Sequence, residues 1–203
     1  MSSDSTKERL LRAAEALIAR EGFAGASMRG VTELAQVNLA AVNYHFGSKE
    51  NLINEVFRRR IDELAERRAQ ALDRVLAEGS PPSLDQILRA FIMPALDMSR
   101  DSTEGREFVQ ILARAYVEYR DPLREFLSRE YGDINSRFFH ALGEALPQLT
   151  PAQLALRVDF IVGALTYVMA DFGMAKMPEG EDSAAYQERV AEELLAFVRA
   201  GMA

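Results

Sequence analysis

Apolar residues recur at intervals of three and four along most of the chain, which is the spacing of one face of a helix. The first such segment starts at Ser5, which has the capping-box spacing to Glu8, and stops at Gly22. This pattern predicts a helix over residues 6–21. Its inward face should hold Leu10, Ala14, Leu17 and Ile18.

Two shorter helices are predicted next. Ser27 is a suitable N-cap for a helix that ends near Ala35, and another helix is expected over residues 39–45. Helices this short gain their stability from packing, so they should pack on the first helix and on each other. The side chains expected to form this small core are Val31, Leu34, Ala35, Val37, Val42 and Phe46.

Longer helices are expected over the rest of the chain. Residues 49–78 have the pattern of one long helix, closed by the turn-forming sequence Gly79-Ser80-Pro81-Pro82. Pro94 should kink the helix that contains it, either beside a ligand cavity or simply around the core. No alternating strand pattern or repeat occurs in the sequence, so the predicted fold class is all-α. The further helices are expected at about 83–99, 103–119, 122–146, 151–175 and 183–200, with Pro122 and Pro151 at first helical positions.

The composition excludes several classes of protein. Hydrophobic residues make up 48% and charged residues 27%, which argues against disorder. The absence of cysteine excludes disulfide scaffolds, thiolate nucleophiles and Cys-based metal sites. Residues 1–14 are charged rather than signal-like, and the longest apolar run, 160–170, is shorter than the roughly 20 residues of a membrane helix. We expect a cytoplasmic protein with no membrane partner.

Charge is distributed unevenly. The net charge is −7, yet residues 1–60 carry nine Lys/Arg against seven Asp/Glu, a balance of +2, and the remainder carries −9. Only the N-terminal segment is therefore electrostatically suited to approach phosphate. Arg58, Arg59 and Arg60, with Arg67 and Arg68, have two interpretations. They are either a nucleic-acid patch or a solvated helix face paired with Asp62, Glu63 and Glu66.

The motifs of the common enzyme classes are missing from the sequence. His45 and His140 follow Val42 and Arg137 at three residues' distance, so the paired Glu-x-x-His motifs of di-iron bundles cannot form. Residues 25–29 lack the last glycine of a nucleophile elbow, and no phosphate-binding glycine motif occurs. We expect no enzyme, cofactor or metal.

The outer face of the third short helix is suited to a DNA groove. With Val42 facing inward, the helical rotation points Ala40 and Tyr44 outward and leaves Ala41 and Asn43 on the flanks. Small alanines permit close approach and can contact a thymine methyl, while an asparagine can pair bidentately with adenine. Tyr44, His45 and Lys49 offer phosphate donors, and Asn38 adds a cap and another possible donor.

The segment Val37-Asn38-Leu39-Ala40-Ala41-Val42-Asn43-Tyr44-His45-Phe46-Gly47-Ser48-Lys49, set after Gly22-Phe23, resembles the tetracycline-repressor (TetR) family over about residues 6–55. Within the family it is most similar to the Asn-Leu-Ala-Ala-Val-Asn-Tyr-His-Phe variant, which includes the fatty-acid-responsive PsrA-like subgroup. The resemblance implies that Arg29 and Thr32 flank the backbone contacts. It also implies a DNA-facing set of Leu39, Ala40, Ala41, Asn43, Tyr44, His45 and Lys49.

The sequence departs from the family pattern at three positions. Gln36 stands where a turn glycine is usual, Asn43 replaces a tyrosine and Ala40 replaces a frequent glycine. A positive φ at Gln36 would strain the turn. The other two changes should alter the preferred operator sequence more than the fold.

The resemblance implies two parts: a helix-turn-helix DNA-binding domain at residues 1–50, and a larger helical ligand-binding and dimerisation domain at 51–203. The expected function is that of a repressor that binds a pseudo-palindromic double-stranded DNA operator as a homodimer. A small apolar effector, with fatty acid or acyl-CoA as the hypothesis, would release it. The alternative is a helical small-molecule-binding module without DNA binding.

The last two helices contain a candidate dimer interface. Residues 160–170 are apolar all round, so the pattern predicts burial on every side, shared between the domain core and a second subunit. Full burial inside one subunit is the alternative. The interface residues expected are Gly163, Ala164, Tyr186, Val190, Leu194, Phe197 and Val198.

Aromatic and large apolar residues of the C-terminal part are candidates for an effector cavity, because ligand sites often lie between helices. Each of them has close-packed core as the alternative interpretation. The candidate lining residues are Phe91, Met93, Phe108, Leu112, Tyr116, Phe126, Phe139 and Tyr167.

Overall fold

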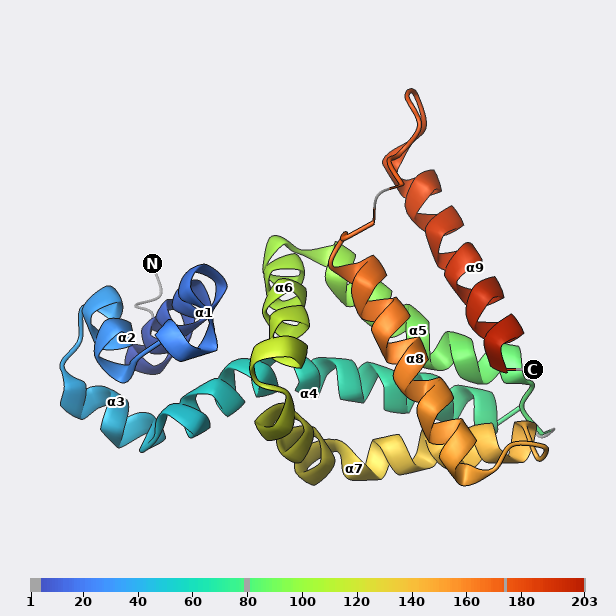
Figure 1. The fold of residues 1–203 in the computed structure, drawn as a ribbon, viewed down its shortest axis with the longest axis horizontal. Coiled ribbons are helices and arrows are strands. Elements are labelled where there is room, and N and C mark those ends of the chain that lie inside the picture. The colour runs from blue at the N-terminus through green and yellow to red at the C-terminus, as the bar shows by residue number, and fades with distance from the viewer. Residues whose placement is uncertain (1–4, 79–80, 174, 203) are drawn as a thin grey trace. The chain divides into compact units, whose positions relative to one another are not determined.

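A computed structural model describes residues 5–78, 81–173 and 175–202, and over these residues the chain forms nine helices and no strand (Figure 1). The predicted all-α fold class is confirmed. Gly79 and Ser80, the first half of the predicted loop, lie outside the described residues. The helices are α1 (Thr6–Gly25), α2 (Met28–Ala35), α3 (Leu39–Phe46), α4 (Lys49–Leu76), α5 (Leu84–Asp101), α6 (Thr103–Glu118), α7 (Arg120–Ala145), α8 (Pro151–Met169) and α9 (Ser183–Met202).

The first helix begins and breaks where its sequence indicates. The Ser5 side chain accepts a hydrogen bond from the Glu8 amide at 3.2 Å, as an N-cap does. Gly22 leaves the helical conformation at φ 80 and ψ 176, and one further turn follows to Gly25. The face predicted to be inward is buried at Leu10, Ala14, Leu17 and Ile18.

The chain folds as two compact units. Unit 1 contains residues 1–63 and 107–130, and unit 2 contains residues 64–106 and 131–203. Helices α4, α6 and α7 each contribute residues to both units. The division into functional domains at 1–50 and 51–203 stays a prediction, since these units are defined by packing alone.

In unit 1, α1, α2 and α3 pack on one another, as their predicted inward faces require. Phe57 of α4 is fully buried, with the rings of Phe23, Phe108 and Phe126 at 6.1, 6.4 and 6.1 Å. Phe23 also stacks on Tyr119 at 4.9 Å. This aromatic cluster joins the end of α1 to α4, α6 and α7.

The predicted small core is right at four of its six positions. Val31, Ala35, Val42 and Phe46 are buried. Leu34 is 47% exposed, so its assignment to the core is wrong, and Val37 is only half-buried. The buried residues of α2 are Val31, Thr32 and Ala35, so its buried stripe lies toward Thr32 and leaves Leu34 outside.

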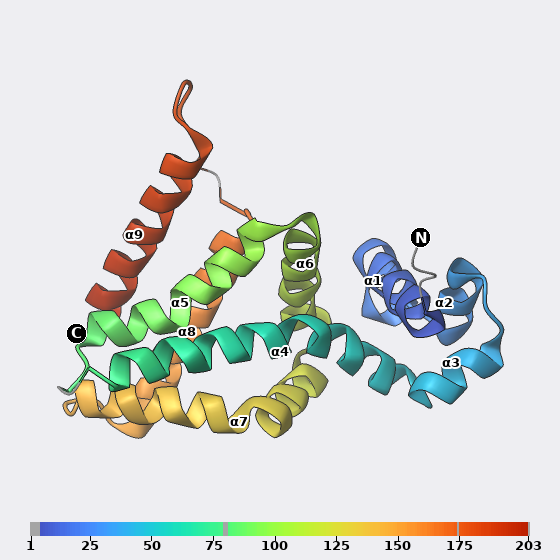
Figure 2. The same cartoon turned by 180° about the vertical axis from the view of Figure 1, so that it is seen from behind.

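In unit 2, α5, α8 and α9 pack on one another (Figure 2). Helix α5 is continuous through Pro94. The Arg68 guanidinium lies 3.8 Å from the centre of the Phe91 ring and donates to the Phe91 carbonyl at 2.9 Å, while Phe138 meets the same ring edge-on. A cationic side chain thus forms part of this packing.

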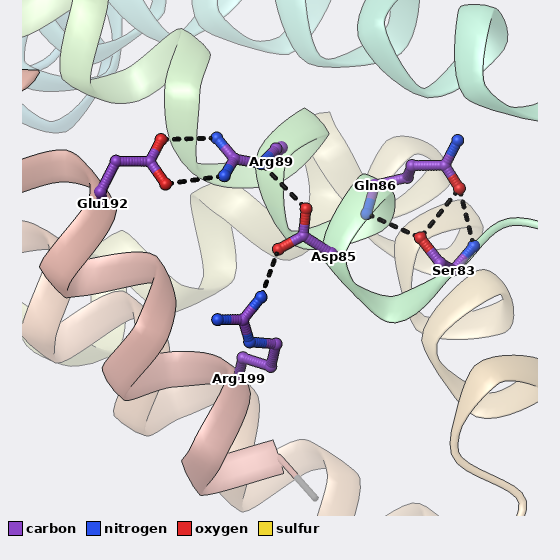
Figure 3. A network of polar contacts seen from close by, with 6 residues as sticks. All are labelled: Ser83, Asp85, Gln86, Arg89, Glu192 and Arg199. Atoms are coloured by element: carbon purple, nitrogen blue, oxygen red, sulfur yellow. Dashed lines mark hydrogen bonds and ion pairs between the residues drawn. The ribbon is translucent and has the colours of Figure 1, made fainter.

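Ion pairs connect α9 to α5 (Figure 3). Arg89 donates to both carboxylate oxygens of Glu192 at 2.8 and 2.7 Å and to Asp85 at 2.9 Å. Asp85 also accepts from Arg199 at 3.1 Å. The same part of α5 begins with a capping box formed by Ser83 and Gln86.

Two predicted helix boundaries are wrong. Helix α8 ends at Met169 rather than Ala175, because Asp171 adopts φ 54 and the amides of Asp171 and Phe172 turn back to carbonyls of the last turn. Aspartate tolerates the left-handed conformation better than most residues, and for this reason no glycine stands at position 171 to mark the end of α8. Helix α7 starts at Arg120, so Pro122 is its third residue and not its first as predicted.

Candidate nucleic-acid interface

Helix α3 presents one exposed face and buries the other. Val42 and Phe46 are buried against the rest of the helix-turn-helix, whereas Tyr44 is 86% exposed. This division is the one expected from the helical rotation about Val42. The residues exposed with Tyr44 are Asn38, Leu39, Ala40, Asn43 and His45, and Ala41 is half-buried.

The start of α3 is fixed by Asn38. Its side-chain oxygen accepts from the Ala41 amide at 2.8 Å, which satisfies one of the free donors of the first turn. The side chain of Asn38 is therefore engaged in capping through its oxygen. Its NH2 group remains as a donor on this exposed residue.

The end of α3 is held by residues that follow it. Gly47 has φ 72, and a Cβ there would meet nothing within 4 Å, so the glycine is present for its backbone conformation. Asn51 donates through its side-chain amide to the Phe46 carbonyl at 3.0 Å, and Ser48 caps the next helix by accepting from the Asn51 amide at 3.1 Å. The serine cap is a sequence signal that sequence reasoning missed.

Lys49 has a structural partner that the sequence did not reveal. Its ammonium group donates to the carbonyl of Phe23 at 2.6 Å and approaches that of Ala24 at 3.3 Å. These carbonyls lie at the end of α1, where unpaired acceptors and the helix dipole favour a cation. Lys49 stays a predicted DNA contact, but its charge is already used to hold α1 to the start of α4.

The two predicted flanking residues differ in their surroundings. Arg29 is exposed and forms a 3.0 Å ion pair with Glu33 one turn later. An exposed pair of this kind contributes little stability and is readily exchanged for another anion. Thr32 is buried and its hydroxyl donates to the Arg29 carbonyl at 2.8 Å, so the structure does not bring its side chain to the exposed face.

Arg9 is a residue of this region that sequence reasoning missed. One nitrogen of its guanidinium donates to the carbonyls of Ala35 and Gln36 at 2.5 and 3.0 Å, across 26 and 27 residues of sequence. Gln36 has φ 54, the positive value that would strain the turn. No local pattern links a residue on α1 to this turn, so only the tertiary structure reveals the contact.

Arg58 and Arg59 of α4 form ion pairs within the chain. Arg58 pairs with Glu55 and Glu130, and Arg59 pairs with Glu8 at 3.0 Å. Glu55 lies on α4 itself, whereas Glu8 and Glu130 lie on α1 and α7. The pairing agrees with the interpretation as an ordinary charged helix face.

A polar contact also joins α6 to the end of α1. Arg114 donates to the Ala19 carbonyl at 2.8 Å, and Glu118 accepts from the Phe23 amide at 3.0 Å. The Arg114 guanidinium beside Glu118, helped by that amide, holds the pKa of the carboxyl below its usual range. Glu118 is therefore held as a carboxylate at the break in α1.

The eight candidate effector-lining residues are divided between the units. Phe108, Leu112, Tyr116 and Phe126 belong to unit 1, and the remaining four, Phe91, Met93, Phe139 and Tyr167, belong to unit 2. Phe91, Phe108 and Phe126 are buried in ring contacts, whereas Tyr167 is 48% exposed. Of the eight, Tyr116 lines a hollow of about 320 Å³ at the corner of α6 and α7, together with Glu118, Tyr119, Arg120 and their neighbours.

The candidate interface residues of α8 and α9 lie on both sides of their helices. Phe160 and Phe197 are each 70% exposed, and Gly163 is open enough that a Cβ would meet nothing within 4 Å. Leu194 and Val198 are instead buried within unit 2, and Ala164, Tyr186 and Val190 are half-buried. The alternative, that residues 160–170 are fully buried inside one subunit, is wrong, because only one face of α8 packs inside unit 2 and Phe160 and Tyr167 are exposed. Burial of the other face against a second subunit stays a prediction.

By length and composition, α8 is also apolar enough to cross a membrane, and 28% of its most apolar 18-residue stretch is buried within the chain. This is weak support for a membrane segment, because the core helix of a soluble protein satisfies the same criterion.

Comparison with known proteins agrees with this geometry. Residues 10–56 match the profile described as "Bacterial regulatory proteins, tetR family", and residues 89–201 match that of "Tetracyclin repressor-like, C-terminal domain". The chain is 26% identical over 105 residues to the probable HTH-type transcriptional regulator YttP of Bacillus subtilis, which covers 52% of this chain and 49% of that protein. It is 37% identical over 54 residues to the HTH-type transcriptional repressor NicS of Pseudomonas putida, 27% of this chain and 26% of that one.

The matched region thus spans about half the length of the first of these relatives and about a quarter of the second. A solved structure, a TetR family transcription regulator from Shewanella sp. PV-4, is similar in fold over 98% of this chain and 96% of its own, with a TM-score of 0.66 and 18% identity. Regulators of this family bind DNA and small-molecule effectors and form dimers. Because the C-terminal profile alone covers more than half of the sequence, this chain belongs to the TetR family of bacterial transcriptional regulators.

Proposed function

We propose that the protein is a cytoplasmic repressor that binds a pseudo-palindromic operator as a dimer and is released by a small apolar effector. The observation that carries this proposal is the exposed face of α3, where Tyr44 is 86% exposed on the side opposite the buried Val42. Two recognition helices would enter successive major grooves, roughly 34 Å or a multiple apart.

The exposed side chains divide into two roles. Ala40 and Ala41 let the helix approach the base edges, and Asn43 pairs bidentately with adenine through the oxygen and the NH2 group of its side-chain amide. Tyr44 and His45 bind phosphate at one end of the helix, and Arg29 does so after exchanging its pair with Glu33. Leu39, 49% exposed, adds an apolar contact at the groove. Lys49 and Thr32 are not needed for this face.

The exposed apolar faces of α8 and α9 support dimerisation with a second copy of the chain. Leu156, Phe160 and Tyr167 lie at helical spacing along α8 and are each about half or more exposed, and Gly163 lies between them. Phe197 continues the apolar surface on α9. Pairing both helices with their copies would form a four-helix interface about a two-fold axis and remove these side chains from water.

Effector release is proposed to act through α4, which is the first helix that runs through both units. An effector with higher affinity for a conformer that spaces the two α3 helices wrongly would shift the population away from the DNA-bound form. A fatty acid or acyl-CoA is the proposed effector, on the strength of the subgroup resemblance. A panel of acyl chains should raise the thermal midpoint, and no shift with any chain length would reject this effector class.

Selection of genomic fragments with purified protein tests the function. We expect recovery of a palindromic duplex that a dimer binds, with affinity that falls steeply as salt rises. A failure to bind any fragment at low salt would contradict the proposal and favour the small-molecule-binding module without DNA binding.

A further inference from the structure

The turn between α2 and α3 has an unusual residue at its tightest point. Gln36 adopts φ 54 and ψ 48, in the left-handed region that L side chains rarely occupy. Its amide donates to the Glu33 carbonyl at 3.2 Å, and the next amide, that of Val37, reaches the Thr32 carbonyl at 3.0 Å. This pair of bonds is the Schellman ending of a helix, in which the left-handed position is usually glycine.

The side chain of Arg9 is fixed at the same point. Its guanidinium donates to the carbonyl of Ala35 at 2.5 Å and to that of Gln36 itself at 3.0 Å. Both carbonyls lie beyond the last intrahelical bonds of α2, where a cation is favoured by the helix dipole. The two acceptors flank the left-handed residue, so the contact holds the peptide units on either side of it.

This turn sets the direction in which α3 leaves α2. Asn38, two residues later, is the N-cap of α3, and no other residue separates the turn from the helix except Val37. We infer that Arg9 is a positioning residue for the recognition helix, which stabilises the left-handed conformation that Gln36 would otherwise disfavour. The inference rests on the proposed DNA-binding function.

A double-mutant cycle between positions 9 and 36 tests this role. The variants are Arg9→Ala, Gln36→Gly and both together, because glycine adopts the left-handed conformation without a side-chain penalty. Arg20→Ala is the matched control, since it removes the same charge from α1 and Arg20 pairs with the adjacent Glu21. Affinity is measured by fluorescence anisotropy, at fixed salt, for a duplex that the wild-type protein selects from a random library.

We expect Arg9→Ala to weaken DNA binding by about tenfold and Arg20→Ala to change it by about twofold at most. In the Gln36→Gly background the loss caused by Arg9→Ala should fall to about twofold to threefold. Arg9→Lys should rescue only part of the affinity, because a lysine ammonium ends one bond short of the guanidinium nitrogen that donates to both carbonyls.

A direct phosphate contact by Arg9 would give a different result. The loss would then be equal in both backgrounds, and the slope of log affinity against log salt would fall by about one. Either observation overturns the positioning role.

Hydrogen exchange provides a readout that does not depend on DNA. The Val37 amide should exchange faster in Arg9→Ala and be protected again when Gln36→Gly is added. If the wild-type protein binds no DNA while this pattern is present, the proposed function fails and the positioning role stands. If DNA binds but neither exchange nor affinity responds to Arg9→Ala, the positioning role fails and the function stands.

Discussion

At the scale of single residues, exposure separates side chains that serve recognition from those that serve the fold. Tyr44 and Asn43 are exposed on α3, whereas Lys49, predicted beside them, donates to carbonyls of α1. Substitution of an exposed residue without such a partner usually changes the free energy of unfolding by less than about 0.5 kcal/mol. The two groups should therefore respond differently when stability and DNA affinity are measured together.

We expect Tyr44→Ala to weaken operator and random DNA alike, while Asn43→Ala relaxes sequence choice by about 1–3 kcal/mol of discrimination. Both variants should keep the wild-type thermal midpoint, and Lys49→Ala should lower it. The measurement is a titration of operator and scrambled duplexes beside thermal unfolding. If Tyr44→Ala and Asn43→Ala both leave operator binding unchanged, the proposed face of α3 is wrong.

Glu118 carries a pH-dependent contribution to stability. Its pKa is lowered below 4.5 in the folded protein, first by Arg114 and then by the Phe23 amide. A depressed carboxyl pKa stabilises the fold above the ordinary value and loses that effect as pH falls through the folded pKa. Glu118→Gln should therefore lower the thermal midpoint at pH 7, with a difference from wild type that shrinks below about pH 4.

The control for this pH dependence is Glu125→Gln, which removes a carboxylate that is 77% exposed and 3.9 Å from Arg129. Its midpoint should follow that of the wild-type protein at both pH values. An equal loss for Glu118→Gln at pH 7 and at pH 3 would contradict the assigned role of the ionised carboxylate.

At the scale of the helix, α9 has two faces with different partners. Leu194 is buried within unit 2, while Phe197, three residues later, is 70% exposed. Charged contacts from Arg89 to Glu192 and from Asp85 to Arg199 fix which face turns inward. The helix is therefore attached to its own chain on one side and available to a second copy on the other.

Truncating each face of α9 should separate these roles. Leu194→Ala should destabilise the folded chain by about 2–5 kcal/mol, because it removes buried methyl groups and leaves a cavity. Phe197→Ala should leave the unfolding of the monomer nearly unchanged and weaken self-association. Denaturant unfolding and sedimentation equilibrium distinguish the two, and a large loss of monomer stability in Phe197→Ala would reject the assignment.

At the scale of the whole molecule, the exposed apolar surface predicts that stability depends on protein concentration. A chain that dimerises through α8 and α9 should unfold at a higher temperature when it is more concentrated. Phe160→Asp should remove this dependence, since it places a charge in the proposed interface. The matched control is Val117→Asp, which introduces the same charge at an apolar residue of α6 that is 86% exposed. Equal behaviour of both variants would contradict the interface.

The same substitution tests how dimerisation is linked to DNA binding. Phe160→Asp should lower operator affinity by roughly tenfold or more, because a monomer has one recognition helix and contacts only one half-site. Random DNA, which is bound through phosphates, should be affected less. A variant that is monomeric yet binds the operator as well as wild type does would contradict the two-fold arrangement.

The sequence by itself determined the helices and the exposed face of α3. Ser5, Ser27 and Asn38 act as N-caps as predicted, since a cap depends on residues within one turn. The rotation about Val42 correctly separated inward from outward positions on α3, because helical geometry fixes that relation. The end of α8 was missed, because its left-handed residue is Asp171 and glycine is the usual signal.

Only the tertiary structure decided which partners those faces meet. Arg9 and Lys49 each reach carbonyls about 26 residues away in sequence, and Glu118 reaches an amide 95 residues away. Leu34 was assigned to the core by its apolar character alone, yet its neighbours leave it half exposed. Local patterns specify periodicity and caps, whereas contacts between helices depend on how every face is satisfied at once, so these roles became visible only in the folded chain.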